Sequence, residues 1–267
     1  MAALNFSSRA RPPQAGRAPT SAVNFSSRER PPQAGGAPTS ALIAAFDLRT
    51  TPLREVNAAL HAPGLAGEFV ILNPAGAHNV AVGVDAPIRV TIDGHVGYYA
   101  AGMNQRAEVI INGNAGTGVA ENMMSGSVWV KGNASQSAGA TAHGGLLVIE
   151  GNAAARCGIS MKGVDIVVGG NVGHMSAFMA QAGRLVIRGD AGEALGDSIY
   201  EARMYVRGDV ASLGADCAPK QMRPEHHREL EQLLKAAGFD DDDTGAYTRY
   251  GSARTLYHFH VDNASAY

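Results

Sequence analysis

The chain has 267 residues, 45% of them hydrophobic, with 22 lysines and arginines against 24 aspartates and glutamates. A formal net charge of −2 gives no basic excess, so we expect no nucleic-acid partner. No apolar run approaches the roughly 20 residues needed to cross a bilayer, so we expect no membrane partner. With no secretory segment and two cysteines, the expected localisation is cytoplasmic.

Residues 1–41 are predicted to form a disordered extension. The sequence LNFSSRARPPQAGRAPTSA (4–22) is duplicated in tandem as VNFSSRERPPQAGGAPTSA (23–41). This Pro/Ser/Arg-rich segment has no apolar periodicity and too little apolar content to form a core. An organelle-targeting segment is the alternative, because arginine and serine are abundant and Glu29 is the sole acid among these residues.

Order is expected to begin near Leu42, and residues 42–68 are predicted to form an N-terminal helix and cap. Thr51 and Pro52 have the chemistry of an N-cap and a first-turn proline, and LREVNAALH continues as a helix to about His61. FVILNP and NVAVGVDAP are then expected as strands of an irregular first coil. Such a coil would block the open strand edges at the end of a solenoid.

One short pattern recurs seven times between residues 69 and 217, always at a spacing of 19 residues. Each copy is a hydrophobic triplet, a polar residue or glycine, and then a repeat glycine followed by His, Asn or Asp. A strict period of this kind indicates stacked repeats. The repeat glycines are Gly94, Gly113, Gly132, Gly151, Gly170, Gly189 and Gly208.

Each copy predicts one β-strand that ends at its repeat glycine. The residues four and two positions before the glycine are aliphatic or Met, and this alternation has the period of a strand. Glycine followed by Asn or Asp is turn chemistry, and columns of small residues further on indicate close backbone approach. The predicted fold is therefore all-β: a single-stranded right-handed parallel β-helix of about seven 19-residue coils, with short capping helices.

The residues three positions before each repeat glycine, which we name the outward column, should point away from the core. The column is nevertheless apolar or aromatic in six of its seven copies. One explanation is β-propensity on a solvated face or cover by the chain's own terminal segments, and the other is a docking surface for a partner. We expect the column to be covered, by the terminal segments or by another subunit. The candidate partner-docking residues are Ile110, Trp129, Val148, Val167, Val186 and Tyr205.

Residues 218–267 are predicted to form a C-terminal helix and an extended tail. The segment 224–237 places Leu230, Leu233 and Leu234 on one helix face, which is typical of a cap or bracket. The acidic run 240–243 is expected to be a solvated loop. The Tyr- and His-rich tail that follows is expected to lie extended on the protein or on a partner.

Few residues of the sequence are arranged as they would be for catalysis. No nucleophile stands with a base and an acid at a recognisable spacing, and no CxxC pair, phosphate-binding loop or dinucleotide fingerprint occurs. His258 and His260 alternate on one extended face and could reach one metal ion, but the sequence offers no third ligand. Cys157 falls in a column of small core residues. We therefore expect no catalytic, cofactor-binding or metal-binding residues on this chain.

The repeated glycine pattern over 69–217 resembles the GXGXG β-helix domain. That domain forms the C-terminus of the glutamate synthase large subunit and is also found as one of the subunits of formylmethanofuran dehydrogenase. The stretch VAENMMSGSVWVKGNASQSAGATAHGGLLVIEG and the tail RYGSARTLYHFHVDNASAY resemble a free-standing version of the domain more specifically. This version is the β-helix subunit of N-methylglutamate synthase, or the GlxC-type glutamate-synthase-like protein, and the similarity runs from about residue 42 to 267.

The resemblance implies a non-catalytic scaffold subunit of an enzyme that makes N-methylglutamate from methylamine and glutamate, a methylamine–glutamate N-methyltransferase. Its partners would be a glutaminase-like subunit and an FMN-dependent synthase-like subunit. FMN and iron–sulfur are then expected on a partner subunit and no cofactor on this chain. Two alternatives remain: the GXGXG subunit of a formylmethanofuran dehydrogenase/hydrolase complex, and an autonomous β-helix enzyme or binding module.

Overall fold

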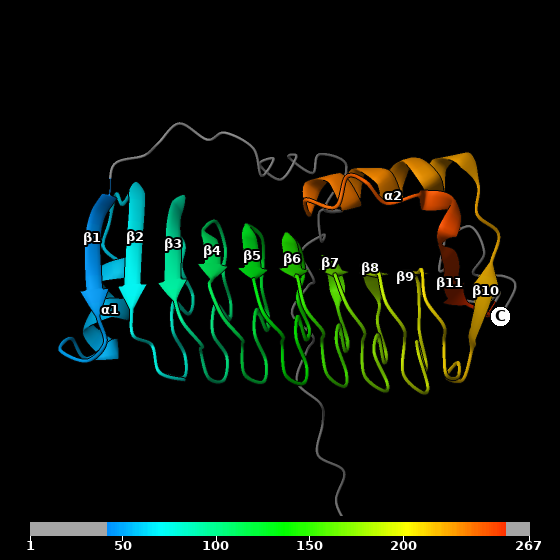
Figure 1. Cartoon of the computed structure of the whole chain (residues 1–267), viewed down its shortest axis with the longest axis horizontal. Helices are drawn as coiled ribbons and strands as arrows, with labels where there is room; N and C mark the ends of the chain where they lie inside the picture. The colour runs from blue at the N-terminus through cyan, green and yellow to red at the C-terminus, as the bar shows by residue number, and fades with distance from the viewer. Residues whose placement is uncertain (1–41, 255–267) are drawn as a thin grey trace, which may run out of the picture. The chain divides into compact units, whose positions relative to one another are not determined.

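The computed structural model describes residues 42–254, whose strands form one sheet in the order β1-β2-β3-β4-β5-β6-β7-β8-β9-β11-β10 (Figure 1). Successive coils of the chain stack along this sheet, so the predicted all-β solenoid is confirmed. The elements are β1 (Leu42–Asp47), α1 (Leu53–Leu60), β2 (Gly67–Leu72), β3 (Ile88–Asp93), β4 (Glu108–Ile111), β5 (Ser127–Val130), β6 (Leu146–Ile149), β7 (Lys162–Val168), β8 (Ala182–Ile187), β9 (Arg203–Val206), β10 (Cys217–Lys220), α2 (Pro224–Ala236), η1 (Thr244–Ala246) and β11 (Thr248–Ser252).

The strands from β3 to β9 pair in parallel at the sequence period of 19 residues. Val109, for example, lies beside Val90 on one side and Val128 on the other. The residues four and two positions before every repeat glycine point inward, and each is at most 1% exposed. Register is therefore fixed by the hydrophobic core, because a slip of one residue would turn this whole set to the outside.

The remainder of each coil forms a second wall of isolated bridges instead of further strands. Val96 bridges Ala115, and the same column continues from coil to coil as far as Val210. Beyond this wall the backbone takes left-handed φ values at alternate residues. In one coil these are Tyr99, Ala101 and Met103, with φ of 60°, 52° and 55°. The column of small residues seven positions after the repeat glycine has left-handed φ values from Ala101 to Gly196.

A ladder of side chains holds the turn that follows each strand. The Oδ1 of Asn152 accepts the backbone N–H of Asn171 at 2.7 Å, one coil further on. Equivalent bonds at the same spacing run from His95 to Asp209. A Cβ added to Gly170 would lie 2.1 Å from the Oδ1 of Asn152. The repeat glycines therefore leave the space that this Asn/Asp ladder occupies.

Helix α1 closes the first coil, with Val56 and Leu60 buried. The Nδ2 of Asn57 donates to the backbone oxygen of Asn79 at 2.8 Å, and its Oδ1 accepts the N–H of Ala81 at 3.0 Å. Backbone groups that a preceding coil would otherwise satisfy are thus paired by a helix side chain.

Two local expectations near the N-terminal end need correction, and one strand there was not predicted. The segment 79–87 contains no strand, because Asn79, Ala81 and Gly83 have left-handed φ values of 58°, 53° and 69°. Helix α1 begins at Leu53, with Pro52 at its N-cap instead of in its first turn. Strand β1 pairs in parallel with β2, although no pattern in the sequence predicted this strand.

The last elements reverse the direction of the chain. Strand β11 pairs antiparallel with both β9 and β10, so the described start of the tail is extended as expected, while residues 255–267 lie outside the described residues. The helix predicted over 224–237 is confirmed as α2, which lies above β7 to β10 in Figure 1. The predictions for residues 1–41 and for His258 and His260 lie outside the described residues. Within residues 42–254, no helix is long and apolar enough to span a membrane.

Candidate functional site

The outward face of the sheet is the candidate site, because it carries the apolar column that the core does not use. The outward column consists of Thr91, Ile110, Trp129, Val148, Val167, Val186 and Tyr205. Two flanking rows lie on the same face. The row five positions before the repeat glycines is Arg89, Glu108, Ser127, Leu146, Asp165, Arg184 and Arg203. The row one position before them is Asp93, Asn112, Lys131, Glu150, Gly169, Arg188 and Arg207.

Helix α2 covers the half of this face formed by β7 to β9. Its side chains Leu230, Leu233 and Leu234 are at most 6% exposed, and they share one apolar cluster with Val167 and Tyr205. For the last part of the outward column the cover is therefore the chain's own helix. The interpretation as a partner-docking surface does not hold for Val167, Val186 and Tyr205, which are fully buried in this cluster.

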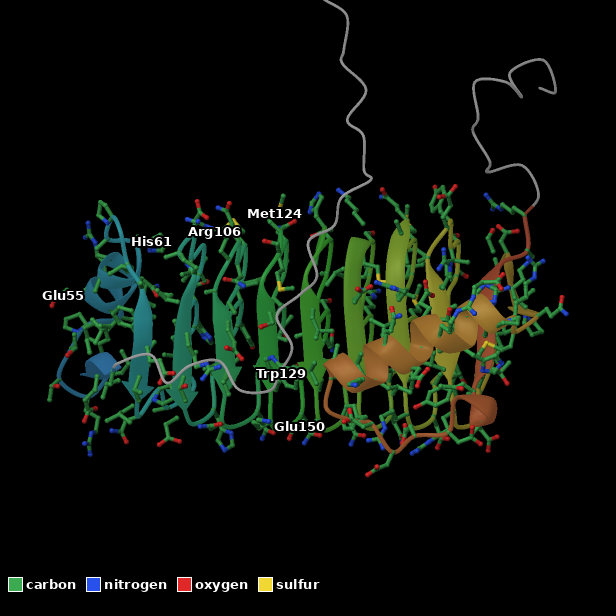
Figure 2. The ribbon with its side chains drawn as sticks, turned by 90° about the horizontal axis from the view of Figure 1, so that it is seen from above. Glu55, His61, Arg106, Met124, Trp129 and Glu150 are labelled. Atoms are coloured by element: carbon green, nitrogen blue, oxygen red, sulfur yellow. The ribbon has the colours of Figure 1, made fainter. Side chains whose placement is uncertain are left out.

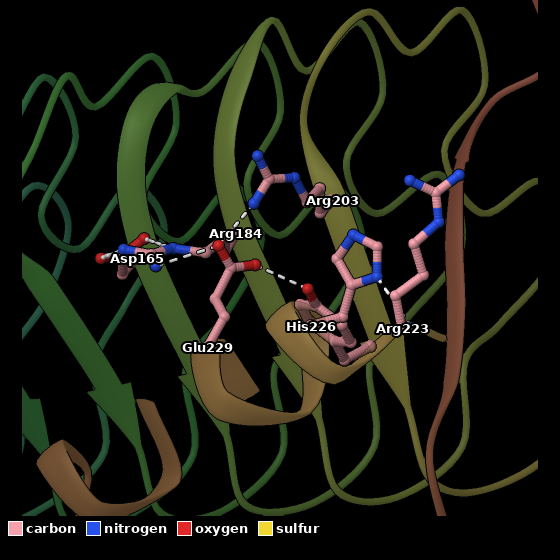
Figure 3. Close-up of polar contacts among 7 residues, drawn as sticks. Asp165, Arg184, Arg203, Arg223, His226 and Glu229 are labelled. Atoms are coloured by element: carbon pink, nitrogen blue, oxygen red, sulfur yellow. Dashed lines mark hydrogen bonds and ion pairs between the residues drawn. The ribbon is translucent and has the colours of Figure 1, made fainter. Parts of the chain in front are cut away.

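A polar network anchors the first half of α2 (Figure 3). The hydroxyl of Tyr205 donates to Oε1 of Glu229 at 2.6 Å, and Arg203 pairs with Oε2 of the same carboxylate. Arg184 lies 3.4 Å from that oxygen through Nη1 and donates from Nε to Asp165 at 2.7 Å. Glu229 thus ties the helix to two consecutive strands, β8 and β9.

The electrostatics of this network favour an ionised Glu229. Burial by itself would raise the pKa of Glu229, yet the hydrogen bonds from Tyr205 and Arg203 hold it below its ordinary value. Burial, followed by the bond to Glu229, raises the pKa of Tyr205, so its hydroxyl stays protonated as the donor. The charged carboxylate is stabilised by its donors in spite of its burial.

The two adjacent histidines of α2 make separate contacts near its start. The Nδ1 of His226 accepts the backbone N–H of Arg223 at 3.1 Å. Burial, followed by the charge of Arg249, lowers the pKa of His226, which keeps its ring neutral and able to accept. His227 lies 3.1 Å from the hydroxyl of Thr244 through its own Nδ1. The ring of His226 therefore caps the start of α2, while His227 joins the helix to η1.

A second anchor follows the helix and corrects the expectation of a solvated acidic loop at one residue, Asp242, whereas Asp240, Asp241 and Asp243 are exposed as expected. Asp242 has a side chain only 7% exposed and accepts from Arg188 at 2.6 and 2.7 Å. Arg207 lies 3.1 Å from the same carboxylate, and Tyr247 donates to it at 2.6 Å. The hydrogen bond from Arg188 is the main reason that the pKa of Asp242 falls to about 2.

The roles of Glu229 and Asp242 were not identified from the sequence, although one signal was available. The strands beneath α2 carry an excess of arginine on their outward side, at Arg184, Arg188, Arg203 and Arg207. Positive charges gathered on a covered face need acidic partners, and these must come from elsewhere in the chain.

The other half of the outward face has a different arrangement. Ile110 is half-buried, and Trp129 is 9% exposed and lies past the end of the α2 ribbon in Figure 2. The Nζ of Lys131 lies 5.5 Å from the centre of the Trp129 ring and pairs with Glu150. Val148 is fully buried at the border between the two halves.

The described side chains form no cluster of His, Cys, Asp and Glu that could hold a metal ion. The expected core position of Cys157 is confirmed, since the residue is fully buried. Burial raises the pKa of the Cys157 thiol to about 12 and that of Cys217 to about 11. Neither thiol is therefore activated as a nucleophile. The repeat glycines from Gly113 to Gly208 each lie against a ladder side chain, whereas Gly94 lies against Pro74.

Comparison with known proteins identifies one clear relative. The chain is 60% identical over 224 residues to Protein GlxC of Rhizobium meliloti (strain 1021), and the match covers 83% of this chain and 98% of that protein. No family model matches the sequence, and no solved structure matches the chain. With this identity over nearly the whole of its relative, the chain belongs to the GlxC family.

Proposed function

We propose that this chain is the non-catalytic β-helix scaffold subunit of a glutamate-synthase-like complex. The complex is N-methylglutamate synthase, which makes N-methylglutamate from methylamine and glutamate. The chain holds a glutaminase-like subunit and an FMN-dependent synthase-like subunit together in the cytoplasm. FMN and iron–sulfur belong to the synthase-like partner.

The observation that carries this proposal is the division of the outward face. The outward column is apolar from β4 to β9, while α2 lies above β7 to β10 (Figure 1). The polar side chains beneath the helix hold it in place: Tyr205 donates to Glu229, and Arg188 donates to Asp242. A rigid solenoid with a partly uncovered apolar face is suited to binding other subunits.

Membership of the GlxC family and the motif resemblance support the same proposal. The resemblance concerns a β-helix domain that is placed between glutaminase-like and synthase-like units. The match covers 98% of the relative, so the similarity extends over nearly the whole of that protein.

Co-expression of the tagged chain with the two proposed partner subunits tests this function. We expect a complex containing all three chains after affinity purification and gel filtration, with its composition read by native mass spectrometry. Recovery of the chain without either partner would contradict the proposal. Recovery with formylmethanofuran dehydrogenase subunits, offered in a parallel co-expression, would contradict it in favour of that complex.

A further inference from the structure

The uncovered half of the outward face has the dimensions of a helix-binding site. We name the residues Val70, Thr91, Ile110 and Trp129 the open strip. They lie side by side on β2, β3, β4 and β5. Val70, Thr91 and Ile110 are half-buried, whereas Trp129 is only 9% exposed. Strands are about 4.8 Å apart, so four of them offer about 19 Å along the sheet. No described helix lies above these strands in Figure 1.

Helix α2 shows how this face accepts an occupant. It has 13 residues, or about 20 Å at 1.5 Å per residue, and it runs across the strands above the outward column. Its leucines pack on Val167, Val186 and Tyr205, which belong to the same column as Ile110 and Trp129. The open strip continues this packed interface without a break, because Trp129 and Ile110 contact the same apolar cluster.

The charge balance of the flanking rows differs between the covered and the open half of the outward face, and this difference indicates which kind of helix would bind the open half. Under α2 the flanking rows are basic, and the helix segment supplies the acids Glu229 and Asp242 to match. Beside the open strip the balance is reversed, with four acids against two bases. The acids are Glu68, Asp93 and Glu108, with Glu150 after β6, and the bases are Arg89 and Lys131. Arg89 pairs with Glu68 and Glu108, and Lys131 pairs with Glu150, so a surplus of two negative charges remains beside the strip.

We propose that the open strip binds one amphipathic helix of about 13 residues from a partner subunit, lying in line with α2. Its apolar face has Leu-like side chains at positions i, i+3, i+4 and i+7, and its edges carry Lys or Arg where α2 carries acids. This inference rests on the proposed function and adds which face meets a partner and by what chemistry.

A second copy of this chain does not fit the strip. Two strips packed face to face would bring acidic rows together, and like charges across an interface oppose binding. The α2 of another copy would place Glu229 beside the acids of the strip. Residues 1–41 are rich in arginine but have no apolar periodicity to match the column.

Two substitutions test the inference in the co-expressed complex. Ile110→Glu places a charge in the centre of the strip, and Asp93→Lys reverses an exposed charge at its edge. We expect affinity for the partner to fall at least tenfold for Ile110→Glu and several-fold for Asp93→Lys. Met179→Glu is the control, because Met179 is 40% exposed and lies outside the outward face. It should bind like the wild type.

Thermal unfolding of each variant separates binding from folding, and Asp93→Lys keeps the test valid if Ile110→Glu is unstable. A photo-crosslinking residue at position 110 should attach to a basic amphipathic helix of the partner, identified by mass spectrometry. Crosslinks to residues 1–41 or to a second copy would overturn the inference. If both strip variants bound the partner with wild-type affinity, the inference would also be overturned, although the proposed function would still stand. If the wild-type chain forms no complex at all, both the proposed function and the inference fail.

Discussion

Single residues in the turns decide whether neighbouring coils can approach. Gly170 and Asn152 form one such pair, because the amide of Asn152 occupies the space that a side chain at Gly170 would need. The ladder bond from Asn171 to Asn152 requires this amide at 2.7 Å. The repeat glycine and the ladder residue one coil earlier are therefore coupled by sterics as well as by spacing.

This coupling predicts a non-additive double-mutant cycle. Gly170→Ala should lower the free energy of unfolding by about 1–3 kcal/mol through overpacking. Asn152→Ala should cost about 1 kcal/mol through the lost hydrogen bond. In the Asn152→Ala background the next contact of the new Cβ is the Gly151 carbonyl at 3.1 Å, so the alanine at 170 should cost much less. Urea denaturation of the four proteins measures the cycle, and strictly additive losses would argue against the steric explanation.

Asp242 predicts a dependence of stability on pH. Its pKa in the folded chain is about 2 against an ordinary 3.8, mainly because Arg188 donates to it. A lowered pKa contributes stability that is fully present above the unfolded value and is lost as pH falls through the folded value. The wild type should therefore lose stability between about pH 5 and pH 2. Asp242→Asn should be less stable at pH 7 and should lose less over the same interval. An unchanged pH profile for Asp242→Asn, measured by denaturant unfolding, would show that this ion pair contributes nothing.

At the scale of elements, α2 is an integral part of the sheet's outward face. Leu230 is fully buried in the cluster between the helix and the sheet. Leu230→Ala should lower the free energy of unfolding by about 2–4 kcal/mol, because the cavity adds to the lost burial. Gln232→Ala on the exposed side of the same helix is the matched control and should change stability by less than about 0.5 kcal/mol. Equal effects of the two substitutions would mean that α2 is not packed on the sheet.

The sequence predicted those elements whose pattern repeats. The 19-residue period indicated the strands and their register, and the leucine spacing indicated α2. Strand β1 was missed because it lies before the repeats and pairs at a different offset, with Asp47 beside Leu72. The segment 79–87 was assigned to strand because its alternating valines and alanines imitate strand periodicity, while alternate left-handed φ values produce the same alternation.

The outward column shows the limit of sequence reasoning for the candidate site. Its apolar composition predicted that it would be covered, but composition could not say which part α2 would occupy. That choice depends on Glu229 and Asp242 reaching arginines 26 and 54 residues earlier in the chain, at Arg203 and Arg188. Such long-range pairing has no local signal, so it became visible only with the helix in place.

At the scale of the whole molecule, the same repeated coil forms two kinds of outward surface, one covered by α2 and one without a described helix above it. Over β7 to β9 the chain supplies its own helix, with acids that match a basic pair of rows. Over β2 to β4 the outward residues are half-buried, and Trp129 on β5 is 9% exposed, between rows with an acidic balance. A solenoid with one half self-covered and the other half open is consistent with a subunit that is completed by assembly.

Reconstitution of activity tests the central claim, a scaffold role in a complex, most directly. N-methylglutamate formed from methylamine and glutamate would be measured with the two partner subunits, with and without this chain, and with this chain alone. We expect formation by the three-chain complex, a large loss when this chain is omitted, and none from the chain alone. Formation of N-methylglutamate by the purified chain alone, or undiminished activity of the two partners without it, would contradict the scaffold role.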